Sequence, residues 1–191
     1  MSNFRIFSRR WTLADSSLLT SPFSCSSDCT FGTLGKALVP LSLAGSKSND
    51  AVSASLPIAF QQGQSNVNIT FNAAQLLRAK YPSAIKASVT LSSFNLSAVN
   101  AVPASKNILS AGAYTSAVYT LPTSNGDVAV PSLPSGAPST TYPTATFTPT
   151  NSGKGATAVL SFGVITGTVN VFDSTSSLLA AVPLRCDEGS K

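Results

Sequence analysis

Histidine is absent from the 191-residue chain, and glutamate occurs once, as Glu188. General acid–base catalysis near neutral pH usually relies on His or on a pair of carboxylates in different environments. The seven acidic residues are scattered, and most fall in expected turns or tails. We therefore expect no catalytic residue, and the chain is predicted not to be an enzyme.

Cysteine is also scarce, with Cys25, Cys29 and Cys186 as its three positions. An odd number leaves at least one thiol outside any disulfide within the chain, so a disulfide framework is not expected. The spacing of Cys25 and Cys29 suits metal ligation, but a tetrahedral zinc site lacks its remaining soft ligands here. Acidic oxygens are too dispersed to hold Ca²⁺ or Mg²⁺. We expect reduced or buried cysteines, no metal and no cofactor.

Charge is low as well, since 10% of the residues are charged and 43% are hydrophobic. Disorder requires low hydrophobicity, whereas the mean hydropathy here is +0.22. The longest strictly apolar run, Leu178–Leu184, is seven residues long, and a membrane-spanning helix needs roughly 20. The N-terminal region has no apolar core of a signal peptide. These features predict intracellular synthesis, no membrane partner, and apolar surface buried against other subunits.

Alternation of apolar and polar residues is the strongest pattern present, and it is typical of β-strands. It runs from Val52 to Phe60 and from Val67 to Phe71. It runs again from Ile85 to Leu91, changes phase over Ser92-Ser93 and resumes at Phe94, which predicts a β-bulge. Further strands are expected at residues 37–43, 114–121, 128–130, 144–148, 156–165, 168–172 and 178–184. The pattern predicts an all-β fold.

Three segments interrupt this pattern. Asn72–Lys80 begins with a helix-capping residue, contains good helix formers and ends with basic residues, so it predicts a helix of about two turns. Asn125-Gly126 predicts a tight hairpin between its flanking strands. Pro131–Pro149 carries five prolines and favours an extended loop. Residues 173–177 are expected to form another turn.

The organisation along the chain indicates an arm followed by one domain. Residues 1–30 hold three arginines, many serines and little periodicity, and predict a flexible or extended N-terminal arm; residues 31–191 form the β domain. Arg5, Arg9 and Arg10 in the arm are candidate RNA-binding residues. Arginines neutralise phosphates with little sequence preference.

A second basic set lies in the middle of the chain. Residues 51–126 contain no acid, and their charged side chains are Arg78, Lys80, Lys86 and Lys106. Arg78, Lys80 and Lys86 are candidates for phosphate contact as well. The favoured alternative is that basic residues stabilise the C-terminal end of the expected helix and keep its surface solvated.

The order of these elements resembles the jelly-roll coat proteins of small icosahedral positive-strand RNA viruses, especially plant viruses. The resemblance is carried by the arm, the short strands, and the small helix between the strand Asn66–Phe71 and the long strand Ile85–Ala98. The most similar stretch is Leu76–Tyr81 leading into Ile85–Val89, because coat proteins often place a helix and an aromatic residue before that strand. A short arm poor in basic residues is most similar to the tymovirus type.

The resemblance implies a jelly-roll β-sandwich of about eight strands. It implies a capsid protein that assembles with copies of itself into an icosahedral shell, packages genomic RNA non-specifically, and is found in the virion and, during assembly, in the host cytoplasm. Coat proteins of this kind commonly carry interface acids that bind Ca²⁺ or sense pH, and this chain has too few. Assembly would then rest on apolar contacts and a weakly basic arm.

The alternative is a β-sandwich binding or adhesion module at a virus or cell surface. It would recognise a glycan or a protein through the proline-rich loop. Tyr114, Tyr119 and Tyr142 are the aromatic residues that could stack on such a ligand.

Overall fold

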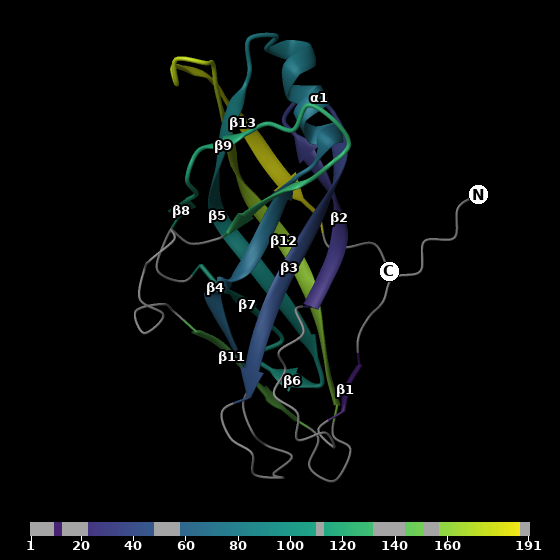
Figure 1. The fold of residues 1–191 in the computed structure, drawn as a ribbon. Helices are drawn as coiled ribbons and strands as arrows, with labels where there is room; N and C mark the ends of the chain where they lie inside the picture. Colours follow the sequence, from purple (N-terminus) through teal and green to yellow (C-terminus); the bar gives the residue numbers. More distant parts are fainter. Residues whose placement is uncertain are drawn as a thin grey trace, which may run out of the picture.

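The computed structural model describes residues 10–12, 23–47, 58–109, 113–131, 144–150 and 157–187. They form thirteen strands of one antiparallel sheet and one helix, which confirms the all-β prediction. Figure 1 shows an elongated sheet that curls on itself, with α1 at one end and β1, β6 and β11 at the other.

Six long strands and the helix make up most of the fold. In chain order they are β2 (Phe23–Phe31), β3 (Lys36–Lys47), β4 (Ile58–Ile69), α1 (Phe71–Lys80), β5 (Lys86–Val99), β12 (Thr157–Phe172) and β13 (Leu178–Cys186). The shorter strands are β1 (Arg10–Thr12), β6 (Ala101–Val102), β7 (Ser105–Asn107), β8 (Tyr114–Thr115), β9 (Tyr119–Thr120), β10 (Val128–Pro131) and β11 (Thr144–Pro149).

The long strands are ordered β4-β3-β2-β13-β12-β5 across the sheet. The short strands lengthen its two sides: β7, β8 and β9 pair with β5, whereas β10 and β11 pair with β4. The segment from β8 to β10 therefore runs from the β5 side of the sheet to the β4 side. Short strands of this kind cover edges that would otherwise be open to pairing with another chain.

The core follows the predicted alternation, and β5 shows it best. Its buried apolar side chains are Ala87, Val89, Leu91, Phe94, Leu96 and Ala98. Leu91 pairs with Gly167 and Ser93 with Thr166, so Ser92 is the extra residue of a bulge. The β-bulge predicted over Ser92-Ser93 is confirmed. A second register shift, between Phe162 and Ile165 of β12, was not predicted.

Helix α1 lies between β4 and β5 as expected, but its cap differs from the prediction. The N-cap is Thr70, whose hydroxyl accepts a hydrogen bond from the Ala73 backbone N–H at 3.1 Å. Asn72, the predicted cap, is exposed within the first turn. Thr and Asn are both good caps, and burial of Ala73, Ala74 and Leu77 against the sheet accompanies the longer helix.

The end of the arm and the hairpin at Asn125-Gly126 also differ from the prediction. Residues 23–30, which were assigned to the arm, form most of β2, where Ser27 and Cys29 are buried. No β9–β10 hairpin is seen at Asn125-Gly126 among the described strands, because β9 pairs with β5 and β10 with β4. Residues 1–9, the start of the strand predicted from Val52, and most of the proline-rich loop lie outside the described residues.

Candidate nucleic-acid interface

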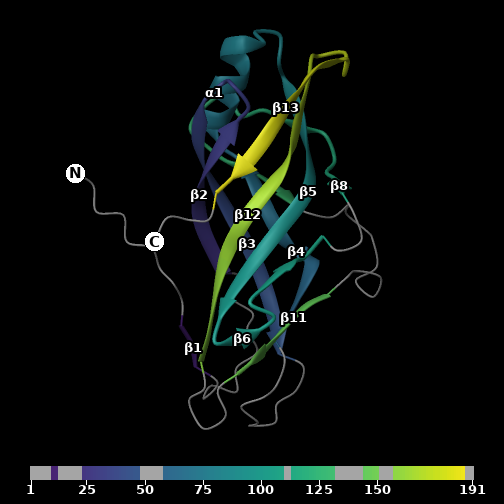
Figure 2. The same cartoon turned by 180° about the vertical axis from the view of Figure 1, so that it is seen from behind.

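The structure places Arg10 and the second basic set at opposite ends of the sheet. Arg10 lies on β1 and pairs with Val159 of β12, whereas Lys86 pairs with Phe172 near the other end of the same strand. At about 3.3 Å per residue, these two rows are roughly 40 Å apart. Both views show β1 and α1 at opposite ends of the molecule (Figures 1 and 2). Arg5 and Arg9 lie outside the described residues.

Arg78 directs its guanidinium group at backbone carbonyls of its own chain. Its Nε donates to the carbonyl oxygen of Ala84 at 3.4 Å, and its two Nη atoms donate to those of Leu121, at 2.7 Å, and Pro122. The side chain is half-buried. These bonds join the end of α1 to the turn before β5 and to the loop after β9, which favours the structural alternative for this residue.

Lys86 reaches the turn between β12 and β13. Its Nζ donates to the Ser176 hydroxyl at 2.9 Å and to the Ser174 carbonyl oxygen at 3.3 Å. Asp173 organises the same turn by accepting hydrogen bonds from Thr175 and Ser177. The Thr175 hydroxyl, the backbone N–H groups of Ser177 and Thr175, and the positive charge of Lys86 hold the pKa of Asp173 below its usual range. Lys86 and Asp173 therefore both form hydrogen bonds within this turn.

Two exposed lysines remain at the α1 end of the sheet. Lys80 ends α1, and no hydrogen bond or ion pair to it is seen within the part of the chain that the structure describes. Lys36, at the start of β3, is also exposed. It was not singled out from the sequence. Its place immediately before an apolar run was the available signal, but its nearness to α1 depends on tertiary packing.

Lys36 lies on the rim of a shallow groove between β3 and α1. The groove has a volume of about 450 Å³. Its lining combines a positive charge, two side-chain amides and two leucines; the residues are Lys36, Ala37, Leu38, Asn72, Gln75, Leu76 and Ala79. None of these lining residues is acidic.

The outer side of β5 and β12 carries hydrogen bonds between uncharged side chains. Asn170 donates to the Thr90 hydroxyl at 3.1 Å, and Thr90 in turn contacts Thr115 of β8 at 2.9 Å. Further along, the hydroxyls of Thr166 and Ser93 are 2.7 Å apart. These bonds form two separate groups of side chains: Ser88, Thr90, Thr115 and Asn170 make up one, and Ser92, Ser93 and Thr166 make up the other. The side chains of both groups are uncharged, and within each group they bond to one another.

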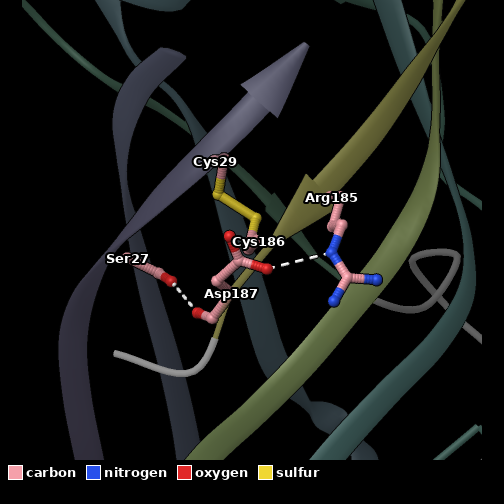
Figure 3. The surroundings of a disulfide bond; sticks show 5 residues. All are labelled: Ser27, Cys29, Arg185, Cys186 and Asp187. Atoms are coloured by element: carbon pink, nitrogen blue, oxygen red, sulfur yellow. Dashed lines mark hydrogen bonds and ion pairs between the residues drawn. A yellow bond between two sulfur atoms is a disulfide. The ribbon is translucent and has the colours of Figure 1, made fainter. Parts of the chain in front are cut away.

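The structure corrects the expectation for the cysteines, because Cys29 and Cys186 form a disulfide (Figure 3). Their strands are neighbours in the sheet, and the two residues face each other in register. Cys25 also lies on β2. Among the described residues, no group of three or more Cys, Asp or Glu is placed to hold a metal ion.

The aromatic residues of the adhesion alternative are placed differently from one another. Tyr114 is buried and Tyr119 is half-buried against the core, while Tyr142 lies outside the described residues. Within the described ranges, no helix has the length and apolar character needed to span a membrane. Comparison of the chain with protein-family models, curated proteins and solved structures gave no match.

Proposed function

We propose that this chain is a structural coat protein that packs against copies of itself to form an icosahedral shell around RNA. The observation that carries the proposal is the exposure of aliphatic side chains near both ends of the sheet. Val99 and Val102, around the turn after β5, are 62% and 61% exposed. Ile85 and Leu178, on either side of Phe172, are 44% and 58% exposed. An exposed aliphatic pair near each end of the sheet suits packing between subunits, because permanent assemblies bury hydrophobic surface at their interfaces.

A jelly-roll arrangement is part of this proposal. Strands β2, β3 and β4 follow one another as antiparallel neighbours, and β13 returns to lie beside β2. The order β13-β2-β3-β4 has the spatial form of a Greek key, the unit from which jelly rolls are built. The division of the curled sheet into two facing sheets stays a prediction.

Assembly is the direct test of the proposal. Purified protein with RNA should form closed particles of uniform size in sedimentation and negative-stain electron microscopy. Replacing Val99 and Val102 by Asp should strongly reduce particle formation, because each charge would have to be buried between subunits.

The matched control is Ser124→Asp, which adds a charge at an exposed loop position. A protein that stays monomeric at high concentration, with and without RNA, would overturn the proposal. Monomers that also give a specific signal on a glycan array would favour the adhesion module instead.

The arm arginines and the lysines at the α1 end should contribute to RNA binding to different extents. Replacing Arg5, Arg9 and Arg10 by Ala should reduce RNA packaging. It should also lower the slope of log affinity against log salt by about 2, since each single-strand phosphate contributes roughly 0.7. Replacing Lys36 and Lys80 by Ala should lower it by roughly 1.4 if both contact phosphate. The measurement is a salt titration of binding to an unstructured RNA.

Arg185→Ala is the control for these variants, because its guanidinium is already paired with Asp187 at 2.9 Å. We expect a smaller change in slope than either set gives. Unchanged slope and packaging after the arm substitutions would remove the arm from RNA binding. Unchanged slope and packaging after substitution of Lys36 and Lys80 would show that the groove between β3 and α1 does not bind RNA.

A further inference from the structure

The disulfide lies where two groups of long strands meet. On one side β2 continues into β3 and β4, and on the other side β13 continues into β12 and β5. Cys29 of β2 faces Cys186 of β13, and 157 positions of sequence separate them. We call the pairing of residues 28–31 with residues 184–187 the seam.

The seam contains fewer residue pairs than the strand pairings on either side of it. Three residue pairs join β13 to β2, whereas eight join β12 to β13 and eight join β2 to β3. The backbone ladder alone is therefore a weak connection between two well-paired groups of strands.

Two hydrogen bonds extend the seam beyond the disulfide. The Ser27 hydroxyl donates to the Asp187 carbonyl oxygen at 2.6 Å, and the Asp187 N–H donates to the carbonyl oxygen of Asp28 at 3.4 Å. Figure 3 shows both cysteines with Ser27 and the Arg185–Asp187 pair around the end of β13. These contacts lie at the end of the strand, where opening costs least.

The sulfur atoms are shielded while the seam is closed. Cys29 and Cys186 are both 0% exposed and belong to the same core as Phe31, Ala37 and Leu184. Thiol–disulfide exchange requires a thiolate to reach a sulfur atom directly. Reduction of this bond and opening of the seam are therefore coupled.

We propose that Cys29–Cys186 is a redox-operated clasp on the seam. In the oxidised protein it holds β13 against β2. When the end of β13 opens, a thiolate of a dithiol reductant attacks one sulfur, forms a mixed disulfide and releases the other cysteine as a thiolate, which takes up a proton. The second reductant thiol then displaces the remaining cysteine. The protein gains two thiols, and the reductant is oxidised by two electrons to a disulfide.

In the reduced protein, the seam is held by its three residue pairs and the hydrogen bonds of Asp187. It then opens more often, while the longer ladders on either side remain closed. The redox state of the clasp thus controls how often β13 separates from β2. It does so whether or not the chain forms a shell.

Hydrogen exchange with mass spectrometry tests the proposal on the full chain. Native protein is compared before and after treatment with dithiothreitol, and the thiols are counted by alkylation. Amides of residues 28–31 and 184–187 should exchange at least tenfold faster after reduction, whereas those of residues 87–91 in β5 should not change. Cys25→Ser is the control, and it should keep both the disulfide and slow exchange at the seam.

Two results would overturn the clasp. One is unchanged exchange at the seam in protein whose Cys29 and Cys186 have been shown to be thiols. The other is reduction that occurs only when β5 exchanges as well, because the bond would then open through global unfolding. The double variant Cys29→Ala, Cys186→Ala should match the reduced protein, and if it does not fold, the dithiothreitol comparison still decides.

Discussion

Replacing Gly167 by Ala should destabilise the protein by about 3 kcal/mol or more, because the new Cβ has no room. It would collide with the backbone carbonyl oxygen of Thr90 and lie 3.1 Å from the Cα of Leu91. Both neighbours are backbone atoms of β5 at the bulge, so relief requires the β5–β12 ladder to separate. The expected fall in the melting temperature is roughly 6–12 °C for a chain of this size.

Gly126→Ala is the control for this substitution. The nearest atom to its added Cβ would be the Ser124 carbonyl oxygen at 4.0 Å, so stability should change by less than about 0.5 kcal/mol. Thermal and urea unfolding of the two variants supply the comparison. Equal stability of Gly167→Ala and the parent chain would show that β5 and β12 do not approach as described.

Replacing Arg78 by Lys should cost about 1.5–3 kcal/mol even though the charge is kept. A single ammonium group cannot reproduce the fork that reaches the carbonyls of Ala84, Leu121 and Pro122. Because Leu121 is fully buried, the region around its carbonyl has little water to replace the lost donor. Urea unfolding measures the loss, and Lys80→Ala, at an exposed position, should stay within about 0.5 kcal/mol.

The same variant separates the two roles considered for Arg78. If the guanidinium group positions the end of α1, Arg78→Lys lowers stability and leaves the salt dependence of RNA binding unchanged. If it contacts phosphate instead, Lys supplies the charge, stability is kept, and Arg78→Ala reduces the salt slope. Retained stability in Arg78→Lys would therefore contradict the structural assignment.

Local patterns predicted the local structure well. The alternation along β5 located the buried residues and the bulge at Ser92-Ser93, because period and phase are properties of one strand. The helix before β5 was located by its composition. Its cap was not, because Thr70 and Asn72 are both suitable caps and the choice depends on which residues pack on the sheet.

Long-range pairings could not be predicted in this way. Cys29 and Cys186 bond because β2 lies beside β13, and neither strand carries a local sign of its neighbour. The hairpin prediction at Asn125-Gly126 was wrong for the same reason, since β9 and β10 have partners elsewhere in the chain.

The candidate site was predictable in composition but not in geometry. Basic residues were identified, yet two of them, Arg78 and Lys86, are bonded to other parts of the chain. Lys36 acquires its setting from α1, which contributes four of the seven residues that line the groove. Contacts of this kind depend on how distant elements pack.

The seam also affects when the molecule can fold. On the ribosome, Cys29 is made 157 residues before Cys186, which corresponds to a delay on the order of 10 s at ordinary elongation rates. Throughout that time the side of β2 that will receive β13 has no native partner. Joining of β2 to β13 must therefore await the synthesis of β13, and contacts this distant in sequence form slowly. Chaperones that cover an unpaired strand edge would act during this interval.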